Sequence, residues 1–449
     1  MNKSITAFLL VAVALATVSC DKTKQLFPKP PAQTPTEDEG EVPPLPENLF
    51  GDDFFETFTD PQSGVVSYYL KSEAIEKDNS QTVYFNGCEM TNDERFIYAL
   101  TTTNEERIRT STESPRPTQE KHGIIIDLAR RKMYRVPSPH GYPWIDPETD
   151  VFYYCTLSAD KTSATFFKRE LLVDPTKVIK LASIPANIVP TGVNKPISRL
   201  ISHLSLTSDK QKVLIDSWIA DQFIWGLLDL YTGEWEEWGH STTVHMTHGI
   251  MNPTHDDEAL FAVDGWDDRS GAHHPIAYDP DGTYPRIQYV KKGLTKTIKP
   301  NPDTNDATHE GLSSDGDYVY WCSAGINVRS FRDGDFYQKV LNTTPGVDAA
   351  THCCPSKDMK YWTFDDNTPY YYRGCSWKVS FFNAETNKRI YIYSSRPQMN
   401  DASHESGLHP DPHPHFVCND KYIVCTMVGD DLNMHWSITP VDQLIEKTL

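Results

Sequence analysis

The sequence predicts an all-β fold, a seven-bladed β-propeller of four-stranded blades. Short runs rich in β-branched and aromatic residues recur along the chain, separated by Asp, Asn, Gly and Pro, as is typical of strands and turns. These runs include residues 95–101, 212–218, 258–266, 318–323 and 421–427. A turn of one form precedes such a run in seven places. With 449 residues, of which 11% are aromatic, the chain also has enough apolar side chains for a large core.

The recurring turn defines the blades. Three copies share a histidine, five residues and an aspartate ahead of a strand, and they begin at His203, His309 and His352. Four looser copies share the turn alone. The seven turn aspartates are Asp93, Asp150, Asp209, Asp257, Asp315, Asp358 and Asp420. Successive aspartates are 43 to 62 residues apart, which suits one four-stranded blade. A pair of β-sandwiches is the alternative fold, but it offers no reason for seven similar turns.

Residues 1–19 have the features of a lipoprotein signal peptide. An apolar run too short to span a bilayer ends just before Cys20, at the expected cleavage site. We expect Cys20 to carry a lipid anchor, with ordinary secretion as the alternative. Prolines and acidic residues predict an extended tether over residues 20–47, followed by the propeller over residues 48–449. The expected location is the bacterial cell envelope, on the periplasmic or surface face of the outer membrane.

Charge limits the partners. The net charge is −20, which argues against nucleic acid and against anionic lipid, because both require a surplus of Lys and Arg. We therefore expect membrane contact only through the lipid anchor, and a monomer. An acidic oligo- or polysaccharide is still a possible partner, since it needs only a locally basic pocket. Eight cysteines besides Cys20 form no CxxC pair, and their disulfide pairing is left open.

Histidines hold the same place in several repeat units. They are His203, His248, His309, His352, and either His413 or His415. Equivalent positions of a propeller converge at one end of its axis, so we expect five imidazoles around one pocket. Imidazoles bind metals or transfer protons. The alternative is that each histidine caps the turn of its own blade.

A metal site is predicted near the C-terminus. His413 and His415 form a His-x-His pair, and an extended strand would point both rings to the same face. With His352 from the neighbouring unit, three nitrogens would meet at a divalent ion such as Mn²⁺, Zn²⁺ or Ca²⁺. A His/Pro-rich loop without metal is the alternative.

Residues 308–321, 351–366 and 413–416 resemble the oligogalacturonate lyases and the related ulvan and rhamnose–glucuronate lyases. The likeness spans about residues 80–430 and lies mainly in the blade turns. It implies β-elimination of a uronate-containing glycan by a seven-bladed propeller lyase.

The resemblance also implies a ligand set for the metal. The family pattern places the metal on His352, His413 and His415, helped by a Gln three residues before the His pair. That position is Pro410 here, which has no donor side chain, so His409 is expected to replace it.

Elimination requires a neutralised carboxylate, a base and an acid. His203, His248 and His309 are the candidate proton-transfer residues. Arg199 is the candidate clamp for the carboxylate, through bidentate hydrogen bonds. Glu310, beside His309, is expected either to orient an imidazole or to bind the metal.

Three aromatic residues and one arginine are further candidates for contact with a sugar or for catalysis. Trp266 and Tyr142 could stack on sugar rings, although propeller strands bury aromatics routinely. Tyr153 and Arg169 keep the Tyr–Arg spacing of the ulvan-type lyases, but the His pair of those enzymes is missing, so we expect strand and surface roles. Two other functions stay open: a non-catalytic cell-surface propeller that binds glycan or protein, and a glycoside hydrolase on the same scaffold.

Overall fold

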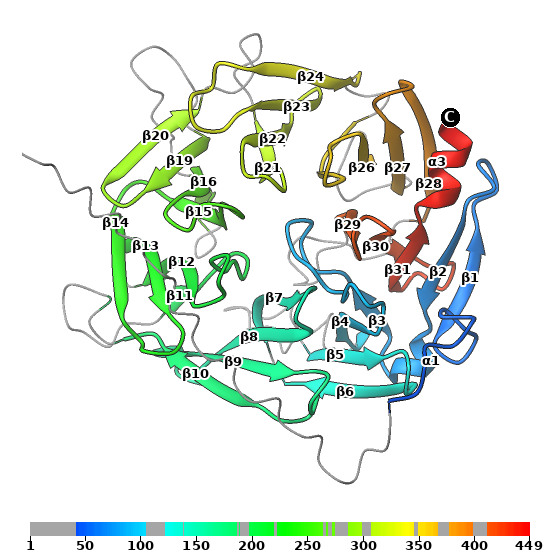
Figure 1. Cartoon of the computed structure of the whole chain (residues 1–449), viewed down its shortest axis with the longest axis horizontal. Helices are drawn as coiled ribbons and strands as arrows, with labels where there is room; N and C mark the ends of the chain where they lie inside the picture. Colours follow the sequence, from blue (N-terminus) through cyan, green and yellow to red (C-terminus); the bar gives the residue numbers. More distant parts are fainter. Residues whose placement is uncertain are drawn as a thin grey trace, which may run out of the picture.

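The chain folds as a ring of seven β-sheets (Figure 1). The computed structural model describes residues 42–104, 122–137, 139–185, 188, 197–219, 222–263, 266–267, 272–273, 286–298, 307–344, 349–366, 377–397 and 411–449. The expected signal peptide, Cys20, most of the expected tether, and His409 with Pro410 lie outside these residues. Among the described residues, no helix is long and apolar enough to cross a bilayer.

Six blades are four-stranded antiparallel sheets whose strands follow one another along the chain. Blade 1 contains β3 (Asn79–Gln81), β4 (Phe96–Thr102), β5 (His122–Asp127) and β6 (Lys132–Val136). Blade 2 contains β7 (His140–Asp146), β8 (Val151–Leu157), β9 (Ala164–Glu170) and β10 (Ile179–Ser183). Blade 3 contains β11 (Ile197–Arg199), β12 (Lys212–Ile219), β13 (Gln222–Asp229) and β14 (Trp235–Ser241).

Blades 4 to 6 repeat this order. Blade 4 contains β15 (Met246–Met251), β16 (Ala259–Val263), β19 (Ile287–Lys291) and β20 (Leu294–Ile298). Between β16 and β19 the chain forms a separate two-stranded hairpin of β17 (Trp266–Asp267) and β18 (Ala272–His273). Blade 5 contains β21 (Thr308–Leu312), β22 (Tyr318–Cys322), β23 (Gly325–Ser330) and β24 (Tyr337–Asn342). Blade 6 contains β25 (Cys353–Pro355), β26 (Tyr361–Asp366), β27 (Trp377–Asn383) and β28 (Lys388–Arg396).

Blade 7 closes the ring by joining the two ends of the described chain. Its C-terminal strands are β29 (His415–Val417), β30 (Tyr422–Val428) and β31 (Met434–Pro440). Strand β2 (Val66–Leu70) pairs with β31, and β1 (Phe55–Thr59) pairs with β2 at the outer edge. Figure 1 shows these strands side by side, blue against red. Helix α1 (Ser72–Ile75) follows β2, and helix α3 (Asp442–Thr448) lies at the C-terminal end beside β28.

The seven turn aspartates all lie between the first and second strands of their blades, as the repeat predicts. In blade 5, the Ser313 hydroxyl donates to Asp315 Oδ1 at 2.5 Å, and the same oxygen accepts the Asp317 N–H at 3.0 Å. The same Ser/Thr–Asp arrangement occurs at Asp93, Asp209 and Asp358. An aspartate that bonds the backbone two residues on favours a turn, which explains why this short pattern recurs.

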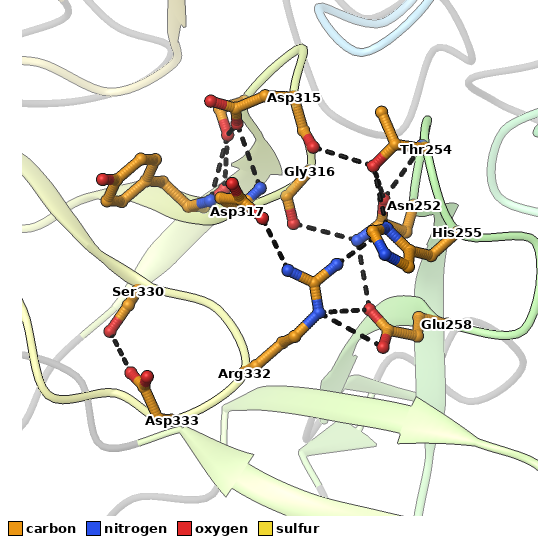
Figure 2. Close-up of polar contacts among 12 residues, drawn as sticks. Asn252, Thr254, His255, Glu258, Asp315, Gly316, Asp317, Ser330, Arg332 and Asp333 are labelled. Atoms are coloured by element: carbon orange, nitrogen blue, oxygen red, sulfur yellow. Dashed lines mark hydrogen bonds and ion pairs between the residues drawn. The ribbon is translucent and has the colours of Figure 1, made fainter.

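The apolar core lies between neighbouring blades, and polar clamps supplement it. Figure 2 shows the clamp between blades 4 and 5, in which Arg332 donates from Nε to both oxygens of Glu258, at 3.2 and 2.9 Å, and from Nη1 to Asp317 at 2.5 Å. Asn252 donates to the Gly316 carbonyl at 2.9 Å. Gly316 has φ +72°, and a Cβ there would lie 2.0 Å from Asn252 Oδ1, so this turn requires glycine.

Candidate metal centre and histidine cluster

Irregular backbone positions the predicted histidines. Inner strands β15 and β21 each carry a bulge, and His248 and His309 lie within them. Their φ angles are +52° and +53°, and His413, just ahead of β29, has φ +47°. Left-handed backbone is costly for residues other than glycine, and a bulge redirects the side chain. Such positions cluster at functional sites.

Imidazoles from four blades meet around the ring of Tyr84, which follows β3. The Tyr84 ring stacks on that of His203, with centroids 4.4 Å apart, and lies 5.9 Å from that of His248. His413 and His352 approach Tyr84 edge-on, at 4.7 and 6.0 Å. The structure therefore brings together the histidines that the blade repeat places at equivalent positions. Burial, and then the charge of Glu310, hold the pKa of the Tyr84 phenol well above its usual value.

Three of the buried side chains form a group suited to a metal ion. The ligand atoms of His352, Asp411 and His413 all lie within 4.8 Å of one another. Asp411 Oδ2 is 3.8 Å from His352 Nε2 and 3.9 Å from His413 Nε2. Each side chain is about 1% exposed. Two imidazoles and a carboxylate are ligands that Mn²⁺ and Zn²⁺ accept, so these residues fit a divalent ion.

The orientation of His352 supports this interpretation. Its Nδ1 lies 2.8 Å from Asp365 Oδ2, on β26, and its backbone N–H donates to Asp365 Oδ1 at 2.7 Å. Metal-binding histidines commonly use the second ring nitrogen in this way, which leaves Nε2 to bind the metal. Burial lowers the pKa of His352, but the charge and hydrogen bond of Asp365 outweigh it and raise the pKa overall.

His415 does not join this group, contrary to the geometry expected from the His-x-His pattern. Strand β29 begins at His415, and the left-handed backbone of His413 breaks the two-residue alternation before it. The His415 ring is bound instead to Glu89, Nε2 to Oε2 at 2.9 Å, and to the His413 carbonyl from Nδ1 at 2.8 Å. Asp411, two residues before His413, takes the third place.

A buried ion pair lies beside the cluster. Arg286 donates to both carboxylate oxygens of Glu310, at 3.0 and 3.2 Å, from just ahead of β19. Glu310 therefore binds an arginine, where we expected it to orient an imidazole or bind a metal. Its neighbour His309 lies against His352, with ring centroids 4.0 Å apart. The guanidinium of Arg286 also acts on the pKa of Tyr84, which it lowers.

The remaining predicted site residues lie at the edge of the cluster, in the core, or outside the residues that the structure describes. The side chains of Arg199 and Trp266 lie outside the described residues, as does His409. Tyr142 lies at the edge of the cluster, with its ring 6.0 Å from that of His203. Tyr153 belongs to the core between blades 2 and 3.

Arg169 and the cysteines also have structural surroundings. Arg169 was expected at the surface, but it is buried and donates to the carbonyls of Pro175 and Arg135 at 3.0 and 3.1 Å. The seven cysteines within the described part of the chain are free thiols. The eighth, Cys375, lies outside the described residues.

Four residues of the site were not singled out from the sequence: Tyr84, Arg286, Asp365 and Asp411. A sequence pattern could have identified Asp365, because an aspartate follows thirteen residues after both His352 and His203, at Asp365 and Asp216. Asp216 accepts bonds from the backbone and hydroxyl of Ser202, beside His203. Nothing in the repeat marks Tyr84 or Arg286.

The fold is similar to that of several solved structures. No protein-family model matches the chain, and no curated protein matches it. Among solved structures, an oligogalacturonate lyase in complex with manganese is similar, with a TM-score of 0.62 and 14% identity, over 86% of this chain and 96% of that one. The oligogalacturonate lyase of Vibrio parahaemolyticus has a TM-score of 0.64 and 14% identity over the same shares. The seven-bladed propeller expected from the blade turns is therefore the fold that this chain shares with oligogalacturonate lyases.

Proposed function

We propose that the protein is a lyase that cleaves a uronate-containing oligo- or polysaccharide by β-elimination, with a divalent metal held by His352, Asp411 and His413. One observation carries the proposal: a compact, buried set of metal ligands shares one site with further imidazoles, a phenol and a guanidinium. The manganese complex of the structurally similar oligogalacturonate lyase supports the choice of ion.

The reaction requires the C5 proton of the uronate to become acidic. A bound divalent metal supplies positive charge that neutralises the neighbouring carboxylate. Within the part of the chain that the structure describes, Arg286 brings a guanidinium to the site, where Glu310 holds it through two hydrogen bonds. We assign Arg286 to the same task, in the role first given to Arg199, since a planar guanidinium matches a carboxylate.

We assign proton transfer to residues other than the three proposed metal ligands. His309 is the candidate base, because its ring directly contacts that of His352. Removing the C5 proton forms the C4–C5 double bond as the C4–O bond breaks. Tyr84 is the candidate acid for the leaving oxygen, since its ring contacts those of His203 and His413 and its phenol carries a proton at neutral pH. His203 and His248, stacked 5.3 Å apart, are left to bind sugar hydroxyls.

The test mixes the purified protein with a panel of uronate-containing glycans and follows the ultraviolet absorbance of the unsaturated product. Elimination predicts an absorbance rise that a chelator and His352→Ala each abolish. The matched control is His240→Ala, an exposed histidine paired with Glu237 on β14, which should leave the rate unchanged. A rise that survives both treatments contradicts the metal role. Binding without any rise would favour a glycan-binding propeller, and hydrolysis without unsaturation a glycoside hydrolase.

A further inference from the structure

His415 connects the metal-ligand group to the closure of the ring. Its Nδ1 is 2.8 Å from the carbonyl oxygen of His413, and its Nε2 is 2.9 Å from Glu89 Oε2. The indole of Trp436, on β31, donates to the other Glu89 oxygen at 3.1 Å. The side chains of His415, Glu89 and Trp436 are at most 1% exposed. The network therefore joins blade 1 to two strands of blade 7 in the interior.

The partners of His415 determine what its ring can do. A carbonyl oxygen only accepts, so Nδ1 must carry a hydrogen, and Nε2 shares a proton with the Glu89 carboxylate. Whichever of the two holds that shared proton, both ring nitrogens are used. This arrangement leaves His415 no nitrogen for a metal.

The backbone of His413 needs an anchor. Its φ of +47° is unfavourable for a non-glycine residue, and Pro414, which follows, disfavours it further because proline restricts the preceding residue to extended backbone. Strained backbone persists only where the surroundings hold it. The hydrogen bond from His415 Nδ1 holds the carbonyl of His413. The centroid of the His413 ring lies 4.5 Å from that of the His352 ring.

We propose that His415 is a positioning residue: through the His413 carbonyl it holds the strained backbone that aims the His413 imidazole at His352 and Asp411, while Glu89 and Trp436 hold His415 itself. The proposal rests on the metal site of the proposed function. It assigns to the second histidine of the His-x-His pair a role different from metal ligation.

Two substitutions in the full-length protein separate the contacts of His415. The amide nitrogen of Asn occupies roughly the place of Nδ1, so His415→Asn keeps a donor for the His413 carbonyl and loses Glu89. The longer Gln places its amide near Nε2, so His415→Gln keeps Glu89 and loses the carbonyl. Titration calorimetry with Mn²⁺ or Zn²⁺ measures metal affinity, and thermal unfolding of the metal-free proteins measures stability.

We expect His415→Gln to weaken metal binding about 10- to 100-fold and His415→Asn to stay within about threefold of wild type, as for other residues that orient a ligand. Stability should follow the opposite order, because His415→Asn leaves the buried Glu89 without its main partner. If His415 had a purely structural role, the metal affinity of each variant would fall in step with its stability. If His415 bound the metal directly, both variants would lose metal affinity equally. Either result overturns the proposal, and so does a metal affinity that is unchanged in both variants.

Trp436→Phe keeps an aromatic side chain but removes the indole donor to Glu89, so it provides a second test if a His415 variant fails to fold. We expect a loss of metal affinity smaller than that of His415→Gln, and no loss contradicts the relay through Glu89. Metal binding by the wild type without lyase activity would refute the proposed function and leave the positioning role intact. A wild type that binds neither ion would refute both.

Discussion

Asp365 accepts two hydrogen bonds from His352, one from the backbone N–H at 2.7 Å and one from Nδ1 at 2.8 Å. One buried carboxylate thus fixes both the main chain and the ring of a proposed metal ligand. Asp216 occupies the same repeat position after His203, where it accepts hydrogen bonds from the backbone and hydroxyl of Ser202 and from the Gly249 N–H. In both blades the carboxylate at this position therefore fixes backbone at or beside a histidine.

Replacing Asp365 with Asn should weaken Mn²⁺ or Zn²⁺ binding by about 10- to 100-fold, because the amide no longer fixes the tautomer that leaves Nε2 open. Titration calorimetry of the two proteins measures the difference. Asp216→Asn is the matched control, since it alters an equally buried carboxylate at the equivalent position. Equal losses in the two variants would mean that the effect is general destabilisation.

Replacing Tyr84 with Phe should keep the stacked rings and remove the proton that we assign to the leaving oxygen. We expect kcat on a uronate substrate to fall about 10²- to 10⁴-fold with little change in KM. Tyr142→Phe, at the edge of the same cluster, should stay near wild type. An unchanged kcat for Tyr84→Phe would remove the phenol from the mechanism.

Much of the fold follows from local chemistry in the sequence. Each turn aspartate bonds groups only a few residues away, so a short pattern such as Ser313 to Asp315 repeats whenever a blade repeats. Histidines at one place in that pattern had to converge, because the blades are related by rotation about one axis. His203, His309 and His352 were found in this way.

The details of the site depend on contacts between distant segments, and the sequence could not predict them. Asp411 and His413 have the same spacing as His413 and His415, so the choice between the pairs rests on where β29 begins and on the left-handed φ of His413. Arg286 reaches Glu310 from another blade. Tyr84 precedes the repeat pattern of its own blade, and only the closed ring brings it to the histidines.

The clamp between blades 4 and 5 makes a prediction for stability (Figure 2). Arg332→Met removes the guanidinium and leaves the buried Glu258 with fewer donors, so we expect the free energy of unfolding to fall by about 1–3 kcal/mol. Arg135→Met is the control, because Arg135 pairs with Glu76 at the exposed surface and should change stability by less than about 1 kcal/mol. Denaturant unfolding compares them, and equal effects would show that the clamp adds nothing.

Asp150 makes a prediction for the pH dependence of stability. Burial, and then the charge of Asp93, raise the pKa of Asp150 to about 6. The folded protein therefore holds this proton more tightly than the unfolded chain, so the contribution of Asp150 to stability falls as pH rises from about 4 to 6 and stays low above that range. Asp150→Asn should remove this cost, and Asn also tolerates the φ of +56° at this turn.

We expect Asp150→Asn to stabilise the protein at about pH 7.5 by about 1–3 kcal/mol, with a smaller gain at about pH 4.5. Thermal unfolding of variant and wild type at the two pH values measures this. Asp160→Asn is the control, because hydrogen bonds from Ser158 and Thr162 lower the pKa of that exposed carboxyl, and its loss should bring no gain. A gain for Asp150→Asn that is the same at both pH values would instead assign the effect to the backbone preference of Asn, since only the ionised carboxylate carries a cost that depends on pH.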